Sequence, residues 1–242
     1  MSRLPSNKTY ASHSYWNSRF ETEESYEWLN SFSDLSPYLL AHLPPPSSLP
    51  RVLLVGVGNS GFSGGMYEAG WTEQVNTDYA GSVVEAMGER CKGSMPRARW
   101  EVMDMTDMGR FGEGEFDAVV DKAGMDAIVS DEGDVWCPND KTVMMCRKYI
   151  EETYRVLKPG GVFVQVSFAQ PHFRTKYLEA KHLTEGEREG GVGSREGVSW
   201  EGGVEVKEIE GGGEGCFQNF FYHMKKKREN GENVGDRKES GA

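Results

Sequence analysis

The sequence predicts an α/β fold: a doubly wound, mostly parallel sheet of seven strands that ends in an antiparallel C-terminal hairpin. Between residues 51 and 168, short apolar runs alternate with helical patterns, an order typical of a parallel sheet with helices on both faces. After residue 200, two strand-like runs follow one another with no helix between them, as in a hairpin. The length of 242 residues suits one large domain or two small ones and allows a core without a disulfide or metal.

Residues 1–50 are predicted to form a helical cap followed by a proline-rich linker. Aromatic and polar residues alternate between residues 10 and 43, and the leucine spacing up to Leu40 indicates one or two short helices. The prolines at 44–46 end them, because consecutive prolines cannot continue a helix.

Residues 51–225 are predicted to form the main domain. Strands are expected at residues 52–55, 74–78, 100–103, 116–120 and 162–166. Helices are expected at residues 62–70, 82–91 and 139–157. The segment Lys158-Pro159-Gly160-Gly161 is expected to end the last helix, with a glycine in the left-handed cap position.

The C-terminal part differs in composition. Glycine and glutamate dominate residues 185–215, which are predicted to be a partly disordered insertion, because such a stretch buries little apolar area. Residues 204–209 and 217–224 are expected to pair as the hairpin. Residues 226–242 are charged and poor in apolar groups, and we expect them to be a disordered tail.

The overall charge excludes several classes of protein. The chain has 27 basic and 38 acidic residues, a formal net charge of −11, so it lacks the basic footprint of a nucleic-acid-binding protein. No apolar run approaches the roughly 18–20 residues of a membrane span, and residues 1–10 lack the apolar centre of a secretory signal. We therefore expect a cytoplasmic protein with no nucleic-acid or membrane partner.

Cysteine and histidine spacing predicts no metal site. The cysteines form no C-x-x-C pair, which favours reduced thiols over zinc ligands or disulfides: Cys91, Cys137, Cys146 and Cys216. The histidines show no ligand spacing either: His13, His42, His172, His182 and His223. Of these, only His172 follows the fifth strand, where a substrate could pass.

A glycine-rich turn predicts a nucleoside-containing ligand. Gly56-x-Gly58-x-x-Gly61 follows the first strand and opens a helix, and glycine lets a ligand approach the backbone closely. Asp78 ends the second strand, where a carboxylate can accept hydrogen bonds from both ribose hydroxyls. A strand-end turn acid is the structural alternative for Asp78.

The nucleoside could belong to a nicotinamide dinucleotide or to a sulfonium cofactor. Two Tyr-x-x-x-Lys pairs have the spacing of short-chain dehydrogenases, Tyr154/Lys158 and Tyr222/Lys226. The first ends at a helix terminus and the second falls on a strand, so we interpret both as chance matches.

A sulfonium cofactor has no pyrophosphate and needs carboxylates and aromatic walls. Asp104 ends the third strand, where its carboxylate can meet the adenine amine, and Met105 can pack against the purine face. A helix N-cap is the structural alternative for Asp104.

Motifs along the main domain resemble the class I S-adenosylmethionine-dependent methyltransferases. They are Leu54-Val55-Gly56-Val57-Gly58-Asn59-Ser60, Thr77-Asp78-Tyr79, Met103-Asp104-Met105 and Arg155-Val156-Leu157-Lys158-Pro159-Gly160-Gly161. Further segments resemble the elongation factor 1-alpha lysine methyltransferases, most closely the lysine methyltransferase 4 family. These are Tyr15-Trp16-Asn17-Ser18-Arg19-Phe20, Tyr26-Glu27-Trp28-Leu29, Asp121-Lys122-Ala123-Gly124-Met125-Asp126-Ala127 and Ala169-Gln170-Pro171-His172-Phe173-Arg174-Thr175.

The resemblance implies S-adenosylmethionine as the cofactor and a set of residues that bind it. These are Trp16, Phe20, Trp28, Gly56, Gly58, Asn59, Asp78, Tyr79, Asp104, Met105, Asp121 and Lys122. The aromatic rings of the cap would close over the cofactor, and Asp121 would orient the incoming ammonium or lie next to the cofactor. The implied activity is methylation of a lysine in elongation factor 1-alpha. A small-molecule methyltransferase and a non-catalytic, methyltransferase-like interaction module remain the alternatives.

The sequence departs from the family pattern at three places. Phe20 stands where a tyrosine is usual, and Ala123-Gly124-Met125 replaces the usual Gly-Thr-Leu beside the site. The third departure is the Gly/Glu-rich stretch at residues 185–215, which resembles an insertion before the hairpin and bears on the inferred substrate more than on cofactor binding. No catalytic base is assigned, because direct in-line transfer mainly requires a positioned and desolvated lysine.

Overall fold

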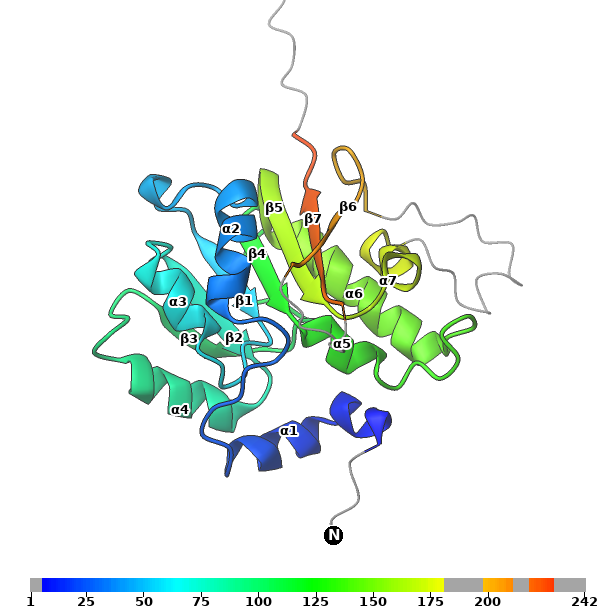
Figure 1. The fold of residues 1–242 in the computed structure, drawn as a ribbon, viewed down its shortest axis with the longest axis horizontal. Coiled ribbons are helices and arrows are strands. Elements are labelled where there is room, and N and C mark those ends of the chain that lie inside the picture. The colour runs from blue at the N-terminus through cyan, green and yellow to red at the C-terminus, as the bar shows by residue number, and fades with distance from the viewer. Residues whose placement is uncertain (1–5, 181–197, 211–217, 229–242) are drawn as a thin grey trace, which may run out of the picture.

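The computed structural model describes residues 6–180, 198–210 and 218–228 (Figure 1). The predicted insertion at residues 185–215 and the predicted tail at 226–242 therefore lie partly outside the described residues.

Seven strands form a single mixed sheet, which confirms the predicted fold class. Their order across the sheet is β3-β2-β1-β4-β5-β7-β6. The five strands from β3 to β5 run parallel, whereas β7 is antiparallel to both β5 and β6. The strands are β1 Val52–Val55, β2 Gln74–Asp78, β3 Arg99–Val102, β4 Phe116–Lys122, β5 Leu157–Ser167, β6 Glu205–Glu208 and β7 Phe220–Lys225.

Helices cover both faces of the sheet. In Figure 1, α2 and α3 lie on one side of the central strands, and α5, α6 and α7 lie on the other. The helices are α1 His13–Phe20, α2 Phe32–His42, α3 Phe62–Glu68, α4 Gly81–Cys91, α5 Gly124–Val129, α6 Asp140–Val156 and α7 Pro171–Leu178. Two short 3-10 turns, η1 Asn7–Ala11 and η2 Pro46–Ser48, complete the described elements.

The alternation of side chains along β1 produces two cores. Leu53 and Val55 pack into the cluster that includes α5, α6 and α7, whereas Val52 and Leu54 pack into the cluster that includes α2 and α3. All four are buried because successive strand residues point to opposite faces and both faces are covered. The apolar run in the sequence is therefore explained by burial on two sides.

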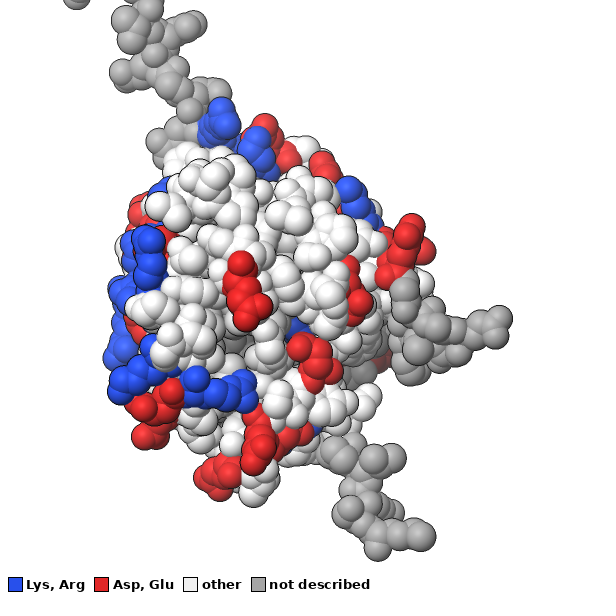
Figure 2. All heavy atoms as spheres, turned by 60° about the vertical axis from the view of Figure 1, so that its left-hand side comes forward, with Lys and Arg blue, Asp and Glu red and all other residues white. Residues whose placement is uncertain are grey.

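Figure 2 shows the face on which α2, α3 and α4 lie, with lysine and arginine mainly along its left-hand and upper margins and acidic residues scattered over the rest. No helix among the described residues is long and apolar enough to cross a membrane. Of the described cysteines, Cys91, Cys137 and Cys146 are free thiols.

Several predicted boundaries agree with the structure and one turn does not. β2 has the predicted bounds, and β3 begins one residue earlier than predicted. The expected left-handed glycine cap of α6 is wrong, since the cap residue Leu157 is already extended and starts β5. Gly160 does adopt a left-handed conformation, with φ of 79°, but it lies within β5, where the register with β4 shifts. Two α-helices, α5 and α7, and the two 3-10 turns were not predicted.

The hairpin of β6 and β7 is confirmed, but the predicted start of the tail at residue 226 is wrong. Lys226 is buried, and its Nζ donates to the carbonyl oxygens of Tyr154 (2.7 Å) and Leu157 (2.8 Å). Its backbone also forms a bridge with Trp200. These interactions extend the ordered domain beyond β7.

Candidate functional site

A cavity of about 650 Å³ opens at the carboxyl ends of the parallel strands. Residues following β1, β2, β4 and β5 line it, together with residues of the N-terminal segment. Its centre lies where β1 separates β2 from β4, the point at which the strand order reverses. Open α/β sheets bind their ligands in this crevice.

The turn after β1 brings bare backbone to the cavity wall. Gly56 and Gly58 have φ of 59° and 53°, a left-handed conformation that glycine adopts without strain. A Cβ atom on Gly56 would lie 3.2 Å from Cε of Met105 and 3.3 Å from Cα of Gly124. A side chain at position 56 would therefore press against Met105 and Gly124, which also line the cavity.

Asp78, at the end of β2, holds this turn in place. Its Oδ2 accepts a hydrogen bond from the Gly58 amide (3.0 Å), and its Oδ1 accepts one from the Ala80 amide (2.9 Å). Burial raises the pKa of Asp78, and these backbone hydrogen bonds oppose that effect. Each carboxylate oxygen keeps a second lone pair, so the group can also accept hydrogen bonds from a ligand in the cavity.

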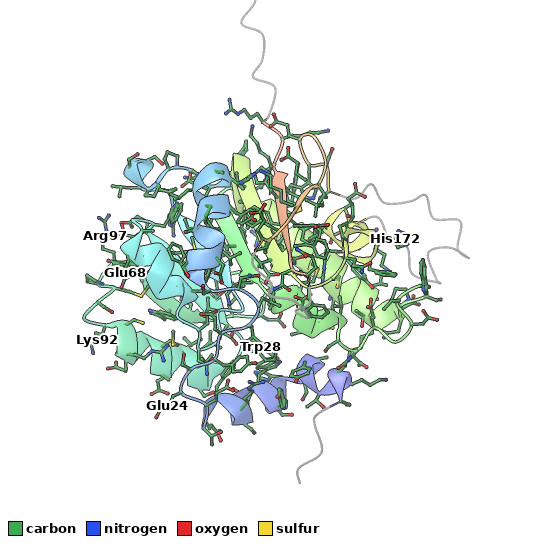
Figure 3. The ribbon with its side chains drawn as sticks, in the orientation of Figure 1. Glu24, Trp28, Glu68, Lys92, Arg97 and His172 are labelled. Carbon is green, nitrogen blue, oxygen red and sulfur yellow. The ribbon has the colours of Figure 1, made fainter. Side chains whose placement is uncertain are left out.

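Residues 7–30, which we call the N-terminal cover, close the opposite wall. In Figure 3, Trp28 lies between the carboxyl ends of the strands and α1. The rings of Trp16 and Phe20 stack at 5.4 Å, and the Arg19 guanidinium lies 5.0 Å from the Trp28 ring. The Trp28 Nε1 is buried and has no hydrogen-bond acceptor among the described residues. A buried donor without an acceptor is unusual, and a ligand in the cavity would supply one.

Two polar residues of the main domain fasten the N-terminal cover. Asn59 accepts from the Tyr26 amide (3.1 Å) and donates to the Glu23 carbonyl (2.8 Å). Lys122, at the end of β4, donates to the carboxylate of Glu27 and to the carbonyl of Trp28 (2.6 Å). The contacts of η1 with α5 and of α1 with α4 complete the closure.

Lys122 is an almost buried cation, with 6% of its side chain exposed. Burial lowers its pKa, and the ion pair with Glu27 counteracts part of that shift. Its ammonium group therefore depends on Glu27 for compensation of its charge. This couples the end of β4 to the N-terminal cover.

The structure brings together all but two of the predicted cofactor-binding residues. Those that line the cavity are Trp16, Phe20, Trp28, Gly56, Gly58, Asn59, Asp78, Tyr79, Met105 and Lys122. Asp104 is exposed outside the lining, and its Oδ1 accepts from the amide and the hydroxyl of Thr106, both at 2.8 Å. A contact between Asp104 and a cofactor remains a prediction.

Asp121 also lies outside the lining, fully buried beneath it. It accepts from the amides of Gly124 (2.6 Å) and Met125 (3.1 Å), the hydroxyl of Tyr149 (3.1 Å) and the side-chain amide of Gln165 (2.9 Å). Burial raises its pKa, and the hydrogen bond from Gln165 opposes this effect. The geometry makes Asp121 a group that fixes the backbone after β4, where Ala123 has a left-handed φ of 71°. Its predicted role toward an ammonium group stays a prediction.

The other end of the cavity contains residues that the sequence did not predict. Three apolar side chains line this end. Phe168 directly follows β5, Phe173 lies in α7, and Val135 lies on the loop before α6. The exposed ring of Trp136 packs edge-on against Phe173 at 5.1 Å and lies 5.2 Å from the ring of His172. The position after the fifth strand could have indicated the two phenylalanines, but nothing in the sequence connects Trp136 to them.

A buried polar group lies at this same end. Asp126 accepts from the Ser167 hydroxyl (2.6 Å) and pairs with the buried guanidinium of Arg174. Burial raises the pKa of Asp126, and the charge of Arg174 opposes this effect. Asp126 belongs to the cavity lining, and its Oδ2 is buried with no hydrogen-bond donor among the described residues. Neither of the two Tyr-x-x-x-Lys pairs lies in the cavity wall.

The arrangement suits a ligand with a flat ring and a polar sugar at one end and a second, thinner molecule at the other. The glycine turn, Asp78, Tyr79 and Met105 supply close backbone approach, acceptors and apolar contact at the first end. Aromatic and aliphatic side chains at the second end can exclude water there, and they share this end with the polar groups of Asp126, Ser130 and Glu132.

The sequence of the chain is similar to that of known methyltransferases. Residues 53–165 match a family described as a methyltransferase domain. The chain is 35% identical over 171 residues to EEF1A lysine methyltransferase 4 of Bos taurus, covering 69% of this chain and 65% of that protein. It is 33% identical over 174 residues to the Mus musculus protein of the same name, covering 71% of this chain and 66% of that protein. The match thus spans about two thirds of the length of these relatives.

A solved structure supports the same fold. The N-methyltransferase NodS from Bradyrhizobium japonicum, in complex with S-adenosyl-l-homocysteine, superposes with a TM-score of 0.55 at 15% identity. The match covers 90% of this chain and 98% of that chain. At this identity the likeness concerns the fold alone.

Proposed function

The chain belongs to the class I S-adenosylmethionine-dependent methyltransferases, and from that premise we propose that it methylates a lysine side chain of a protein, elongation factor 1-alpha. The observation that carries the proposal is the cavity at the point of strand reversal, closed by an aromatic cover and open to an apolar second end. The names of the relatives matched over most of the chain support the choice of lysine and of this protein. The proposal includes a cytoplasmic location, because translation takes place there.

The residues present fit S-adenosylmethionine. The glycine turn offers bare backbone for close approach, and Asp78 has spare lone pairs for ribose hydroxyls. The buried Trp28 N–H needs an acceptor, which a ligand carboxylate or hydroxyl provides. When bound, this cofactor supplies a methyl group on a positively charged sulfur, which is a good leaving group.

The residues at the second end would prepare the lysine. Phe168, Phe173 and Val135 remove water from an amine that enters the cavity. Desolvation disfavours the charged form of an amine, so its pKa falls and the neutral, nucleophilic form becomes more abundant. Positioning beside the cofactor then provides most of the remaining acceleration.

Asp121 would contribute through the backbone and not as a base. Its two oxygens accept from the Gly124 and Met125 amides, and this fixes the strained turn at Ala123, which lies in the cavity lining. No residue is assigned as a general base, because methyl transfer from the sulfonium mainly requires a neutral amine that is held in line with the methyl group.

Two measurements test the proposal in sequence. Calorimetric titration with S-adenosylhomocysteine, with NADH as the matched control ligand, should give micromolar binding of the first and none of the second. Binding of NADH alone, or of neither ligand, would reject the cofactor assignment.

Transfer of labelled methyl groups to elongation factor 1-alpha then tests the substrate. The expected product is a methylated lysine identified by mass spectrometry of the digested substrate. A protein that binds S-adenosylhomocysteine but leaves elongation factor 1-alpha unlabelled, while labelling small amines, would be a small-molecule methyltransferase. A protein that labels neither would have the role of an interaction module.

A further inference from the structure

Three potential metal ligands meet on the sheet, outside the cavity wall. His42 is the last residue of α2, Glu205 is the first residue of β6, and His223 lies in β7. One nitrogen or oxygen atom from each lies within 4.8 Å of the others. The sequence predicted no metal site, because 163 and 18 residues separate the three positions along the chain.

The fold itself brings these residues together. Glu205 and His223 are directly paired across the antiparallel β6–β7 ladder, so their side chains lie on the same face. α2 packs on that face, with the Tyr38 hydroxyl donating to the carbonyl of Glu208 (3.2 Å) and the His42 ring 5.3 Å from Phe221. The rings of His42 and His223 are 4.8 Å apart.

The hydrogen bonding of His42 orients its ring for coordination. Its Nδ1 lies 2.7 Å from the carbonyl of Tyr38, an acceptor, so Nδ1 carries the proton and Nε2 keeps its lone pair. This is the arrangement by which metal-ligating histidines are commonly fixed. The Nδ1 of His223 lies 3.6 Å from Oε2 of Glu205.

The donor set selects the class of ion. Two imidazoles and one carboxylate suit zinc and neighbouring transition metals, whereas calcium and magnesium prefer oxygen ligands. In tetrahedral coordination with metal–ligand distances of about 2.0–2.1 Å, ligand atoms lie about 3.4 Å apart. Glu205 is 64% exposed in its side chain and can move the short distance required, and it leaves the site open to solvent.

We propose that His42, Glu205 and His223 form a binding site for a zinc-type divalent ion, with water in the remaining coordination position. None of the three residues lines the cavity, so the ion would not take part in methyl transfer. It would link the end of α2 to the β6–β7 hairpin and stabilise their packing. The nearby charge of Lys207 opposes a cation and moderates the affinity.

Titration with Co²⁺ tests the site directly, because a cobalt ion in a tetrahedral site absorbs visible light. We expect a visible absorption band that saturates at one ion per chain, and displacement of that band by Zn²⁺. A protein that shows no such band and no zinc-dependent rise in melting temperature would overturn the proposal.

A matched pair of variants on β6 links the ion to the named residues. Glu205→Gln should weaken binding at least tenfold, whereas Glu208→Gln, which removes the same charge from the other face of the strand, should leave it unchanged. His42→Ala and His223→Ala should abolish the cobalt band. Equal effects of the two glutamate variants would contradict the site. Because these readouts need no methyl donor, they are independent of the proposed activity.

Discussion

Asp78 combines two tasks in one carboxylate. It accepts the amides of Gly58 and Ala80, and so shapes the glycine turn, and its remaining lone pairs face the proposed ribose position. Removing the carboxylate therefore affects both the turn and the ligand contact.

We predict that Asp78→Ala weakens the binding of S-adenosylhomocysteine about ten- to a hundredfold. Hydrogen bonds to charged groups contribute on the order of 1.5–3 kcal/mol, which corresponds to this range. Calorimetric titration of the folded variant measures the effect. The control is Asp107→Ala, an exposed acid outside the cavity lining. An unchanged dissociation constant for Asp78→Ala would remove this residue from the cofactor site.

Lys122 gives the site a pH dependence on the alkaline side. Burial lowers its pKa from the ordinary lysine value of 10.5, and the ion pair with Glu27 opposes this effect. As the pH rises through this lowered pKa, the ammonium loses its proton and the ion pair that fastens the N-terminal cover is lost. We predict weaker binding of S-adenosylhomocysteine above that pH, measured by titration at a series of pH values.

Loss of this proton from Lys122 has the opposite effect on the stability of the fold, which it increases. The folded state binds the proton less tightly than the unfolded state does. Between the lowered pKa and 10.5, the contribution of Lys122 to the free energy of unfolding therefore rises with pH. Lys122→Arg keeps its charge throughout this range and should flatten the pH dependence of binding. If Lys122→Arg loses affinity for S-adenosylhomocysteine at alkaline pH as the wild type does, the loss arises from a group other than Lys122.

At the scale of elements, two adjacent glycines of α3 report on how α2 packs. A Cβ atom on Gly65 would lie 2.5 Å from Cγ of Phe32, whereas a Cβ atom on Gly64 would meet nothing within 4 Å. Gly65 is therefore the residue that lets the first turn of α2 lie directly on α3.

We predict opposite effects of alanine at these two positions. Gly65→Ala should lower the free energy of unfolding by about 1–3 kcal/mol, because the added methyl group overpacks the contact. Gly64→Ala should raise it by about 0.5–1 kcal/mol, because alanine has the higher helix propensity. Denaturant unfolding measures both. Equal effects would show that helix propensity alone determines the change in the free energy of unfolding. The contact between α2 and α3 would then accommodate the added methyl group without destabilising the fold.

The elements that could be predicted from the sequence are those marked by an apolar run and by turn residues within a few positions of each other along the chain. β1 and β2 have the expected bounds because strands of a covered sheet are punctuated by turn residues. α7 was not predicted, because its buried residues include Arg174, whose burial depends on Asp126 of another element. Within the site, Gly56 and Asp78 could be identified as strand-end residues. The pairing of Lys122 with Glu27 could not, since it joins segments whose proximity only the fold determines.

At the scale of the whole molecule, the net charge of −11 favours a basic protein as substrate. Acidic residues are also concentrated beside the second end of the cavity, where Asp131, Glu132 and Asp134 border a neighbouring hollow. Exposed charges act over a distance that salt reduces, about 10 Å at 0.1 M and about 3 Å at 1 M ionic strength.

We predict that kcat/KM for the protein substrate falls as ionic strength rises, whereas the dissociation constant of S-adenosylhomocysteine changes little. The first depends on exposed charges that attract the substrate, and the second on buried contacts that salt does not reach. Initial rates and titrations at several salt concentrations measure the two quantities. A protein-methylation rate that is independent of salt would contradict electrostatic attraction of the substrate.

The order of strands in the antiparallel part has a consequence for synthesis. β7 pairs with β5 on one side and with β6 on the other, although β6 precedes it along the chain. On the ribosome, β5 and β6 therefore emerge before the strand that joins them, and the backbone of β5 from Val162 to Ser167 waits without its neighbour. An unpaired strand edge is a template for association with other chains. Until β7 has been synthesised, this open edge of β5 is thus available for pairing with other chains.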